Sequence, residues 1–366
     1  MTGKGNTYES SGVAALDRRA GFRALLGQLK QTFALRTGTG RSLLDFGAYA
    51  SILEIGGLQA LAISTDGVGT KAIVAQLMDR YDTVGIDCVA MNANDILCVG
   101  AEPIAMLDYI AVEVAGDRLL EEIGKGLLEG ARQANISIPG GEISQIPEII
   151  RSERPGYGFD LLGTAVGLVD KDAVVVGEGV TPGQAIVGLA ASGIHSNGLT
   201  LARKVLLEGA PFRLDRHVDE LGRTLGEELL EPTRIYVKAA MPMLREGLAS
   251  ALCHITSDGF LNLSRVRAPV GFEIDSLPPT PAVFELIQRV GKVTYEEMYR
   301  VYNMGIGFCV VCAPEAVSRV IEHAKAAGCE AWEIGRVVAD SRKRVWLRQQ
   351  GLVGERGRFT HHTDAS

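Results

Sequence analysis

One glycine-rich turn constrains the fold of this chain more than any other segment. It reads Ser64-Thr-Asp-Gly-Val-Gly-Thr-Lys71, and it joins an apolar run at 58–63, which predicts a strand, to an apolar run at 72–78, which predicts a helix. Glycines let backbone N–H groups approach an anion, and the start of a helix favours negative charge. The four-residue spacer between the glycines of a Walker A loop is absent. We therefore predict a phosphate-binding loop of another kind in an α/β fold, with a plain glycine-rich turn as the alternative.

Charged side chains in and near this turn suggest a nucleotide with a divalent cation. Lys71 supplies a point charge, and Asp66 offers carboxylate oxygens. The next segment, 83–98, is almost wholly apolar, yet helical spacing places Asp87, Asn94 and Asp95 near one face of it. Carboxylates there are costly unless paired or bound to metal, and oxygen ligands suit Mg²⁺ better than zinc. The alternative is that Asn94 and Asp95 hydrogen-bond a neighbouring element.

Two further glycine turns carry polar side chains. Gly140-Gly-Glu142 reads as a turn that ends a short strand and presents a carboxylate. The turn at 190–198 follows a strand-like run and precedes a helix from about Leu199 to Glu208. Its Ser196 and Asn197 are good N-cap types, so a structural role is the alternative for them. The imidazole of His195 lies in the same glycine-flanked turn, which is a suitable place to meet a ligand.

Taken in order, these motifs resemble one enzyme family. The ordered set runs from about Thr7 to about Arg336 and is similar to the phosphoribosylformylglycinamidine cyclo-ligases, the aminoimidazole ribonucleotide synthetases of purine synthesis. Its members are Thr7–Val13, Asp45–Gly47, Ser64–Lys71, Asp82–Asp87, Asn94–Asp95, Gly100–Pro103, Leu107–Tyr109, Gly140–Glu142, Ser192–Gly198, Glu231–Lys238 and Tyr302–Gly307.

The resemblance implies a reaction and the residues that serve it. ATP would phosphorylate the formyl amide oxygen of formylglycinamidine ribonucleotide, and the amidine nitrogen would then close the imidazole ring as phosphate leaves. The implied catalytic residues are His195, Lys71 and Asp95. The implied Mg²⁺ ligands are Asp66, Asp87, Asp95 and Glu142. The implied ATP-binding residues are Asp66, Gly67, Val68, Gly69, Thr70, Lys71 and Asn94. The implied substrate-binding residues are Gly141, Glu142, Ser192, His195, Ser196 and Asn197. Whether His195 acts as a base, and whether K⁺ is needed, stays open.

The chain departs from the family's pattern at three places. Where the family has threonine followed by three glycines, this chain has Ser257 and Asp258 after Thr256, which adds side chains where backbone would approach a ligand. Ala14–Asp17 follows Gly12-Val13 where the family usually has acidic residues. Gln145 stands where the family has a further acidic residue. Two alternatives therefore remain, a related ATP-dependent phosphotransferase of the same superfamily and a non-catalytic nucleotide-binding relative. The long match at Glu231–Lys238 favours the cyclo-ligase over the first alternative. The presence of Asp66, Lys71, Asp95 and His195 argues against the second.

The order of the predicted elements indicates two α/β domains followed by a tail. We predict an N-terminal ATP-binding and dimerisation domain at 1–170, a C-terminal α/β domain at 171–345 and a polar tail at 346–366, with His361 and His362 solvated. The expected strands are 61–65, 104–112, 161–169, 185–189, 251–256, 307–312 and 332–338. The expected helices are 72–78, 83–98, 118–133, 199–207, 233–244 and 316–327. The resemblance implies that the first domain contributes strands to a barrel across a two-fold axis, so that the chain forms a homodimer.

Composition excludes several other classes of protein. A net charge of −7 without a basic stripe argues against a nucleic-acid platform, and no apolar run is long enough to span a membrane. The N-terminus has no apolar core typical of a secretory signal, so we expect a cytoplasmic location. Six cysteines in 366 residues do not form a disulfide framework, and Cys309 and Cys312 would point to opposite faces of a strand. We expect all six to be small core residues.

Overall fold

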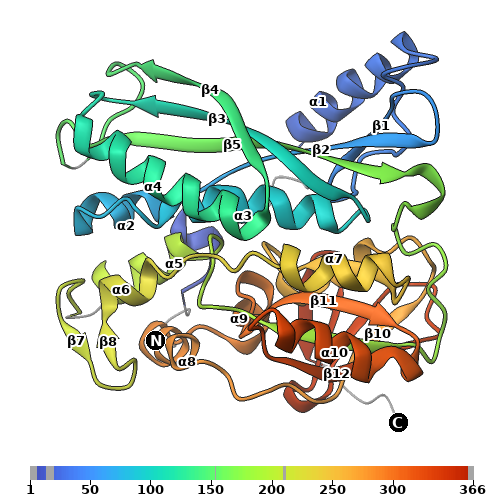
Figure 1. The fold of residues 1–366 in the computed structure, drawn as a ribbon. Coiled ribbons are helices and arrows are strands. Elements are labelled where there is room, and N and C mark those ends of the chain that lie inside the picture. Colours follow the sequence, from blue (N-terminus) through green and yellow to red (C-terminus); the bar gives the residue numbers. More distant parts are fainter. Residues whose placement is uncertain (1–5, 14–19, 153, 209–211, 362–366) are drawn as a thin grey trace.

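Two mixed β-sheets, each covered by helices, make up the structure (Figure 1). The computed structural model describes residues 6–13, 20–152, 154–208 and 212–361. Within these ranges, residues 51–170 build a five-stranded sheet, and residues 185–361 build an eight-stranded sheet. The two-domain α/β architecture expected from the order of elements is therefore confirmed.

The five-stranded sheet of the N-terminal domain has the order β1-β2-β5-β3-β4. Only β3 and β4 are parallel; the other neighbouring pairs are antiparallel. Buried and half-buried or exposed positions alternate along β5, as expected when helices cover one face of a sheet. The strands are β1 (Ser51–Glu54), β2 (Gln59–Gly67), β3 (Glu102–Val112), β4 (Ser137–Gln145) and β5 (Phe159–Asp170).

Helices α3 (Val84–Leu97) and α4 (Asp117–Ala134) lie on the side of this sheet that faces the C-terminal domain (Figure 1). Glycine lets the two helices approach closely: a Cβ atom on Gly85 would lie only 2.2 Å from the backbone nitrogen of Leu127. Helix α2 (Lys71–Met78) follows β2 directly, while α1 (Ala20–Gln31) lies at the edge and buries no residue. The apolar segment 83–98 thus becomes the central helix between the domains.

The eight-stranded sheet of the C-terminal domain has the order β15-β14-β13-β10-β12-β6-β11-β9. Strands β6 and β11 lie inside it, and β11 is buried along its whole length. Its strands are β6 (Ala185–Ala190), β9 (Ala249–His254), β10 (Gly271–Ile274), β11 (Ile306–Cys312), β12 (Ala331–Val338), β13 (Val345–Leu347), β14 (Leu352–Glu355) and β15 (Arg358–His361). The remaining elements are α5 (Leu199–Arg203), a π-helical turn (Lys204–Glu208), the hairpin β7 (His217–Val218) and β8 (Arg223–Thr224), α6 (Leu225–Leu229), α7 (Val237–Arg245), a 3₁₀ segment (Gly259–Arg265), α8 (Ala282–Gly291), α9 (Tyr295–Val301) and α10 (Val317–Ala326).

Three expectations about local structure need correction. The predicted polar tail is wrong up to His361, because β14 and β15 extend the sheet and the Phe359 side chain is buried; His362 lies outside the described residues. Gly140 and Gly141 lie inside β4 rather than in a turn. The helix expected from 233 begins only at Val237, because the residues before it bond to α3.

The cysteines agree with the sequence-based expectation. All six are free and buried. Burial raises the pKa of the Cys253 thiol to about 12, which keeps it protonated and unreactive at neutral pH. Among the helices of the described ranges, none combines the length and apolar character needed to cross a bilayer.

Candidate active site

The glycine-rich turn adopts the predicted strand–loop–helix geometry. Strand β2 ends at Gly67, α2 begins at Lys71, and Gly69 has φ +64°, a region that favours glycine. The N–H groups of Gly69, Thr70 and Lys71 donate to no residue in the described part of the chain. Three N–H groups without an acceptor at the start of a helix form a ready anion-binding surface.

The loop also contacts the second domain. The hydroxyl of Thr70 lies 2.9 Å from that of Thr200 on α5, and both side chains are partly exposed. The glycine-rich loop therefore lies where the two domains meet, so that a ligand on the loop would be near both domains.

Lys71 and Asp87 form a buried ion pair. The Lys71 ammonium lies 2.9 Å from Asp87 Oδ1, and both side chains are fully buried. The same oxygen accepts hydrogen bonds from the backbone N–H and hydroxyl of Thr233, at 2.8 and 2.6 Å, and from the hydroxyl of Ser196 at 3.2 Å. Four donors around one oxygen repel a cation. Both side chains therefore have protein partners in this structure, and the roles of Lys71 at phosphate and of Asp87 at Mg²⁺ stay predictions.

The run Glu231–Lys238 explains this burial, because its first residues hold α3 from the second domain. Lys71 donates to the Glu231 carbonyl at 2.5 Å. Asn94 donates to the Arg234 carbonyl and accepts from the Tyr236 N–H, each at 2.9 Å. Asn94 is fully buried in these contacts, and its role at ATP stays a prediction.

Asp95 is held by a residue that the sequence analysis did not single out. His254, at the end of β9, is fully buried, and its Nδ1 lies 2.9 Å from Asp95 Oδ1. The Asp95 side chain is 17% exposed, and no described residue bonds its other oxygen. Asp66 lies near enough for its pKa to be raised, first by burial and further by the charge of Asp95. Asp95 thus lies near Asp66, with one oxygen bonded to His254.

A third carboxylate, Asp108 on β3, lies on the same face of the five-stranded sheet as Asp66, and the sequence did not predict it as a site residue. The strand register pairs Asp66 with Gly163, Gly163 with Asp108, and Asp108 with Gly141. Residues paired across neighbouring strands share a face, so Asp66 and Asp108 flank a position without a side chain. Partial burial raises the pKa of the Asp108 carboxyl. Asp108 lies in Leu107–Tyr109, a segment that contributed to the family resemblance but to which no ligand role was assigned.

Gly141 and Glu142 have different roles from those predicted. A Cβ on Gly141 would lie 2.4 Å from Asp108 Oδ1, so the glycine leaves room for that carboxylate. Glu142 is exposed one residue further along β4, and alternation turns it to the opposite face of the sheet. In the described ranges, no three His, Cys, Asp or Glu side chains cluster closely enough to hold a metal. The four-carboxylate Mg²⁺ site is therefore not assembled within one chain.

The turn containing His195 is stabilised from inside. His195 has φ +68° and is 2% exposed, and its Nε2 accepts from the Ser192 N–H at 3.2 Å. Burial lowers the pKa of this imidazole well below its ordinary value, so it is neutral. Gly198 occupies the N-cap of α5 without a side-chain cap bond, so the capping alternative for Ser196 and Asn197 is wrong. His195 supports the turn through this bond, and its role toward a ligand stays a prediction.

Of this turn, Asn197 is the residue best placed to meet a substrate. It is partly exposed, and its Oδ1 accepts from the Ser257 hydroxyl at 2.7 Å. Asp258 has φ +74°, the conformation that glycine would adopt at this position of the family's loop. Ser192, by contrast, uses its hydroxyl to bond the Pro232 carbonyl at 2.5 Å. The altered loop therefore forms a defined structure directly beside the His195 turn.

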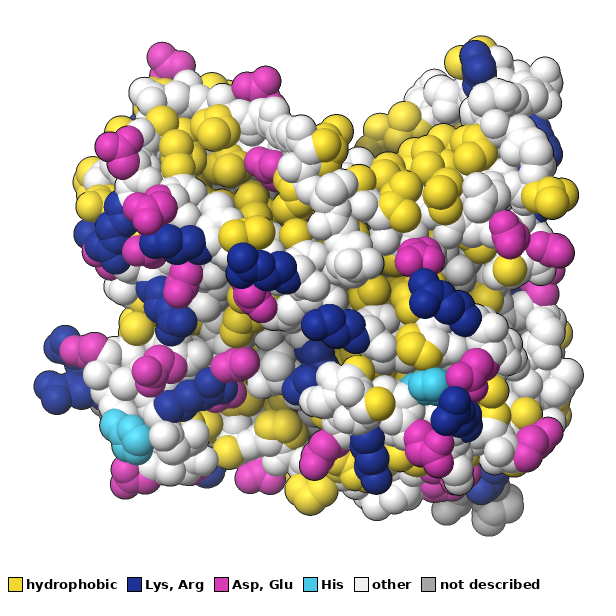
Figure 2. All heavy atoms as spheres, in the orientation of Figure 1, with side chains coloured by type: hydrophobic (Ala, Val, Ile, Leu, Met, Phe, Trp, Pro, Cys, Tyr) yellow, Lys and Arg dark blue, Asp and Glu magenta, His cyan; other side chains and the backbone are white. Residues whose placement is uncertain are grey.

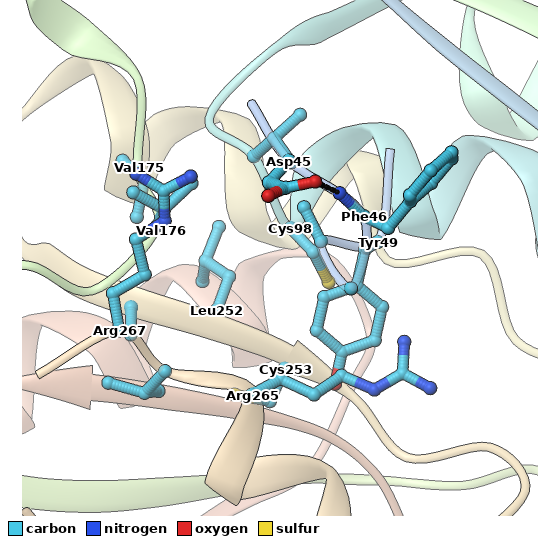
Figure 3. Close-up of a pocket in the computed structure, with 15 residues that line it drawn as sticks. Asp45, Phe46, Tyr49, Cys98, Val175, Val176, Leu252, Cys253, Arg265 and Arg267 are labelled. Carbon is cyan, nitrogen blue, oxygen red and sulfur yellow. Dashed lines mark hydrogen bonds between the residues drawn. The ribbon is translucent and has the colours of Figure 1, made fainter. Parts of the chain in front are cut away.

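A cavity of about 230 Å³ lies at the domain boundary (Figure 3). Figure 3 shows the Tyr49 ring between Cys98 and Arg265, with the Arg265 guanidinium 4.7 Å from the ring centre. The Tyr49 hydroxyl donates to the His254 carbonyl at 3.1 Å, which joins the cavity wall to the Asp95–His254 pair. The rest of the cavity lining is mostly apolar. It comes from residues 45–49, the end of α3, the linker at Val175–Val176, β9 and residues 265–267.

Comparison with known proteins gives matches along both domains. The family model described as AIR synthase related protein, N-terminal domain, matches residues 47–169, and its C-terminal counterpart matches residues 181–348. The phosphoribosylformylglycinamidine cyclo-ligase of Methanobrevibacter smithii is 43% identical over 92% of this chain and 96% of its own length. The protein of that name from Thermococcus kodakarensis is 44% identical over 93% and 97%, and that from Methanocaldococcus jannaschii 48% over 79% and 81%.

Solved structures share the fold at lower identity. A thiamine-monophosphate kinase from Stenotrophomonas maltophilia has a TM-score of 0.57 at 21% identity and covers 86% of this chain and 93% of its own. Thermotoga maritima PurL complexed with ATP has a TM-score of 0.55 at 18% identity and covers 87% of this chain and 46% of its own. At these identities the likeness concerns the fold alone.

Proposed function

The chain belongs to the AIR synthase family of phosphoribosylformylglycinamidine cyclo-ligases, and from this membership we propose how its residues carry out the reaction. The activity is an ATP-dependent ligation in purine biosynthesis. ATP activates the formyl amide oxygen of formylglycinamidine ribonucleotide, and ring closure gives aminoimidazole ribonucleotide, ADP and phosphate. Such chemistry depends on positioning and charge neutralisation more than on acid–base groups.

One observation supports the location of the ATP phosphates. The free N–H groups of Gly69, Thr70 and Lys71 lie at the end of β2, directly after Asp66. We place the terminal phosphates on these N–H groups, with Gly67 and Val68 shaping the loop. The Lys71 side chain takes no part, because it is buried against Asp87.

Asp66 and Asp108 fit a Mg²⁺ ion that accompanies the nucleotide. Both carboxyls have a raised pKa, so the protein disfavours their negative charges until a cation is near. Mg²⁺ in nucleotide sites usually takes one or two carboxylates together with phosphate oxygens, which agrees with two carboxylates on one sheet face. The ion would neutralise charge on the transferred phosphoryl group. Asp95 lies beside Asp66 as a third acidic group of the cleft.

The two organic parts of the ligands fit opposite sides of these carboxylates. We assign the base and ribose of ATP to the cavity beside Tyr49, since an apolar lining with a stacked arginine suits a flat aromatic ring. We assign formylglycinamidine ribonucleotide to the second domain's side of the cleft, at Asn197 and Ser257. Thr70 and Thr200 then hold the two domains together where phosphate passes from one ligand to the other.

We also propose that the chain forms a homodimer through the outer face of the five-stranded sheet. Figure 2 shows hydrophobic side chains gathered over the upper part of the molecule, where Figure 1 draws this sheet. Ile104 and Leu107 on β3 and Leu58 beside β2 are 40–83% exposed. A row of apolar side chains on an uncovered sheet is a liability unless a second surface covers it.

The experiment that tests the function is ADP release by the purified protein with Mg·ATP, measured with and without formylglycinamidine ribonucleotide and with and without K⁺. We expect ADP release that depends on this substrate and equals the aminoimidazole ribonucleotide formed. ADP release without the substrate, or with a different phosphate acceptor, would instead support a related phosphotransferase.

A further inference from the structure

A row of buried hydrogen bonds lies directly behind Asp95 and has no part in the chemistry proposed above. It runs from the segment Arg234–Tyr236 through Asn94 to His254 and ends on Asp95. Asn94 and His254 are both fully buried. Buried polar groups that are fully bonded can hold a single arrangement, because every alternative leaves a donor or acceptor unpaired.

The orientation of the Asn94 amide follows from its backbone partners. The Tyr236 N–H can only donate, so the Asn94 atom 2.9 Å from it must be the oxygen. The Arg234 carbonyl can only accept, so the Asn94 atom 2.9 Å from it must be the NH₂ group. Both contacts agree, and a flipped amide would place donor against donor and acceptor against acceptor.

The fixed amide in turn determines the proton on His254. The Asn94 NH₂ group lies 3.4 Å from His254 Nε2, so Nε2 has to be the acceptor and carries no proton. The ring therefore carries its proton on Nδ1, which lies 2.9 Å from Asp95 Oδ1 and donates to it. In the other tautomer, a protonated Nε2 would face the NH₂ group of Asn94, and the lone pair of Nδ1 would face the Asp95 carboxylate.

We propose that His254 is a positioning residue, held by Asn94 in the Nδ1–H tautomer so that its N–H fixes the Asp95 carboxylate toward the Mg·ATP side of the cleft. Asp95 and Asn94 belong to the first domain, whereas His254 and the segment Arg234–Tyr236 belong to the second. The carboxylate is oriented only where the two domains are docked. That Asp95 faces Mg·ATP rests on the proposed function, whereas the tautomer does not.

The first experiment observes the tautomer without any ligand. In ¹⁵N-labelled protein, the imidazole nitrogens of His254 are identified by their loss in His254→Gln. We expect an unprotonated Nε2 and a protonated Nδ1 that couples to a hydrogen. A protonated Nε2 would overturn the proposal. His323→Gln, on α10 beside Glu246, is the control that loses a different histidine.

The second experiment separates the Nδ1 donor from mere filling of space. His254→Asn keeps an N–H donor near the Nδ1 position, whereas the His254→Gln side chain extends its NH₂ toward the Nε2 position. We expect His254→Gln to raise the Kd for Mg·ADP and the KM for Mg·ATP by about 10–100-fold, as changes behind metal-site ligands usually do. His254→Asn should stay closer to the wild type, and the Kd for nucleotide in excess EDTA should change little.

The outcomes distinguish this inference from the proposed function. Equal loss in both variants, with unchanged melting temperatures, would make His254 a packing residue and overturn the inference. Wild-type protein that binds Mg·ADP but forms no aminoimidazole ribonucleotide would refute the proposed function, while the tautomer and the Kd comparison would still test the inference.

Discussion

The buried pair Lys71–Asp87 should be a main determinant of stability, and Lys71→Met tests this. The substitution fills similar volume but removes the positive charge that contacts Asp87. Asp87 Oδ1 would keep three neutral donors, from Thr233 and Ser196, while Oδ2 bonds to no group in the described ranges. An uncompensated buried carboxylate costs about 3–5 kcal/mol, so we expect the free energy of unfolding to fall by about that amount.

A double-mutant cycle shows whether charge or packing causes the loss. Asp87→Asn alone leaves the buried ammonium with neutral oxygen acceptors and no compensating charge, and it should also lose about 3–5 kcal/mol. Lys71→Met/Asp87→Asn removes both charges, while the new amide oxygen still accepts from Thr233. The double variant should therefore lose at least about 2 kcal/mol less than the sum of the single variants.

Urea denaturation followed by tryptophan fluorescence and circular dichroism measures these values. Both tryptophans, Trp332 and Trp346, report on the second domain, whereas circular dichroism reports on both. Lys125→Met is the matched control, because this lysine pairs with Glu121 at an exposed site and its loss should not shift the transition. The reasoning is refuted if Lys71→Met unfolds at the wild-type urea concentration, or if the single losses simply add.

Three further perturbations address pH, catalysis and assembly. His195 is neutral in the native state, whereas the unfolded state protonates it below pH ~6.5. The free energy of unfolding should therefore decrease by up to about 1.4 kcal/mol for each unit by which the pH is lowered below that value. His195→Asn, which tolerates the left-handed backbone, should flatten this slope in urea titrations at pH 5–7. Asp108→Asn should lower substrate-dependent ADP release by at least ~100-fold without changing the melting temperature. Asp172→Asn, at an exposed position, should leave the rate of ADP release unchanged. A wild-type rate in Asp108→Asn would remove Asp108 from the site. Leu107→Arg should yield a monomer by light scattering, whereas Leu128→Arg on α4 should stay dimeric; a monomeric wild type would refute the dimer.

The local elements of this fold could be predicted from the sequence because their signals are local. The loop between β2 and α2 was identified from its glycines and the flanking apolar runs, and the structure has a strand and a helix there. The same patterns predicted β11 and β12, where apolar runs are bounded by turns. Strands β14 and β15 were missed because a polar, glycine-containing hairpin has little apolar signal of its own, although pairing to β13 makes it part of the sheet.

The site was predicted less well because its assignments depend on direction and pairing. A lysine at the start of a helix reads as a phosphate ligand, but nothing local shows that the Lys71 side chain turns back toward Asp87. Asp108 becomes a candidate only when the register of β5 between β2 and β3 is known. His254 lies at the end of an apolar strand more than a hundred residues from Asp95, a distance that no periodicity spans.

The bonds from Glu231–Tyr236 to α3 limit how this molecule can move. A hinge that opened the cleft would pull the Lys71 ammonium and the Asp87 carboxylate away from the second domain's carbonyl, amide and hydroxyl partners. The same motion would break both hydrogen bonds between Asn94 and the backbone of Arg234 and Tyr236. Opening at this seam would cost several buried polar contacts together, so the domains behave as one block. We therefore expect substrates to reach the site while the two domains stay docked, through movements of surface loops and not of whole domains.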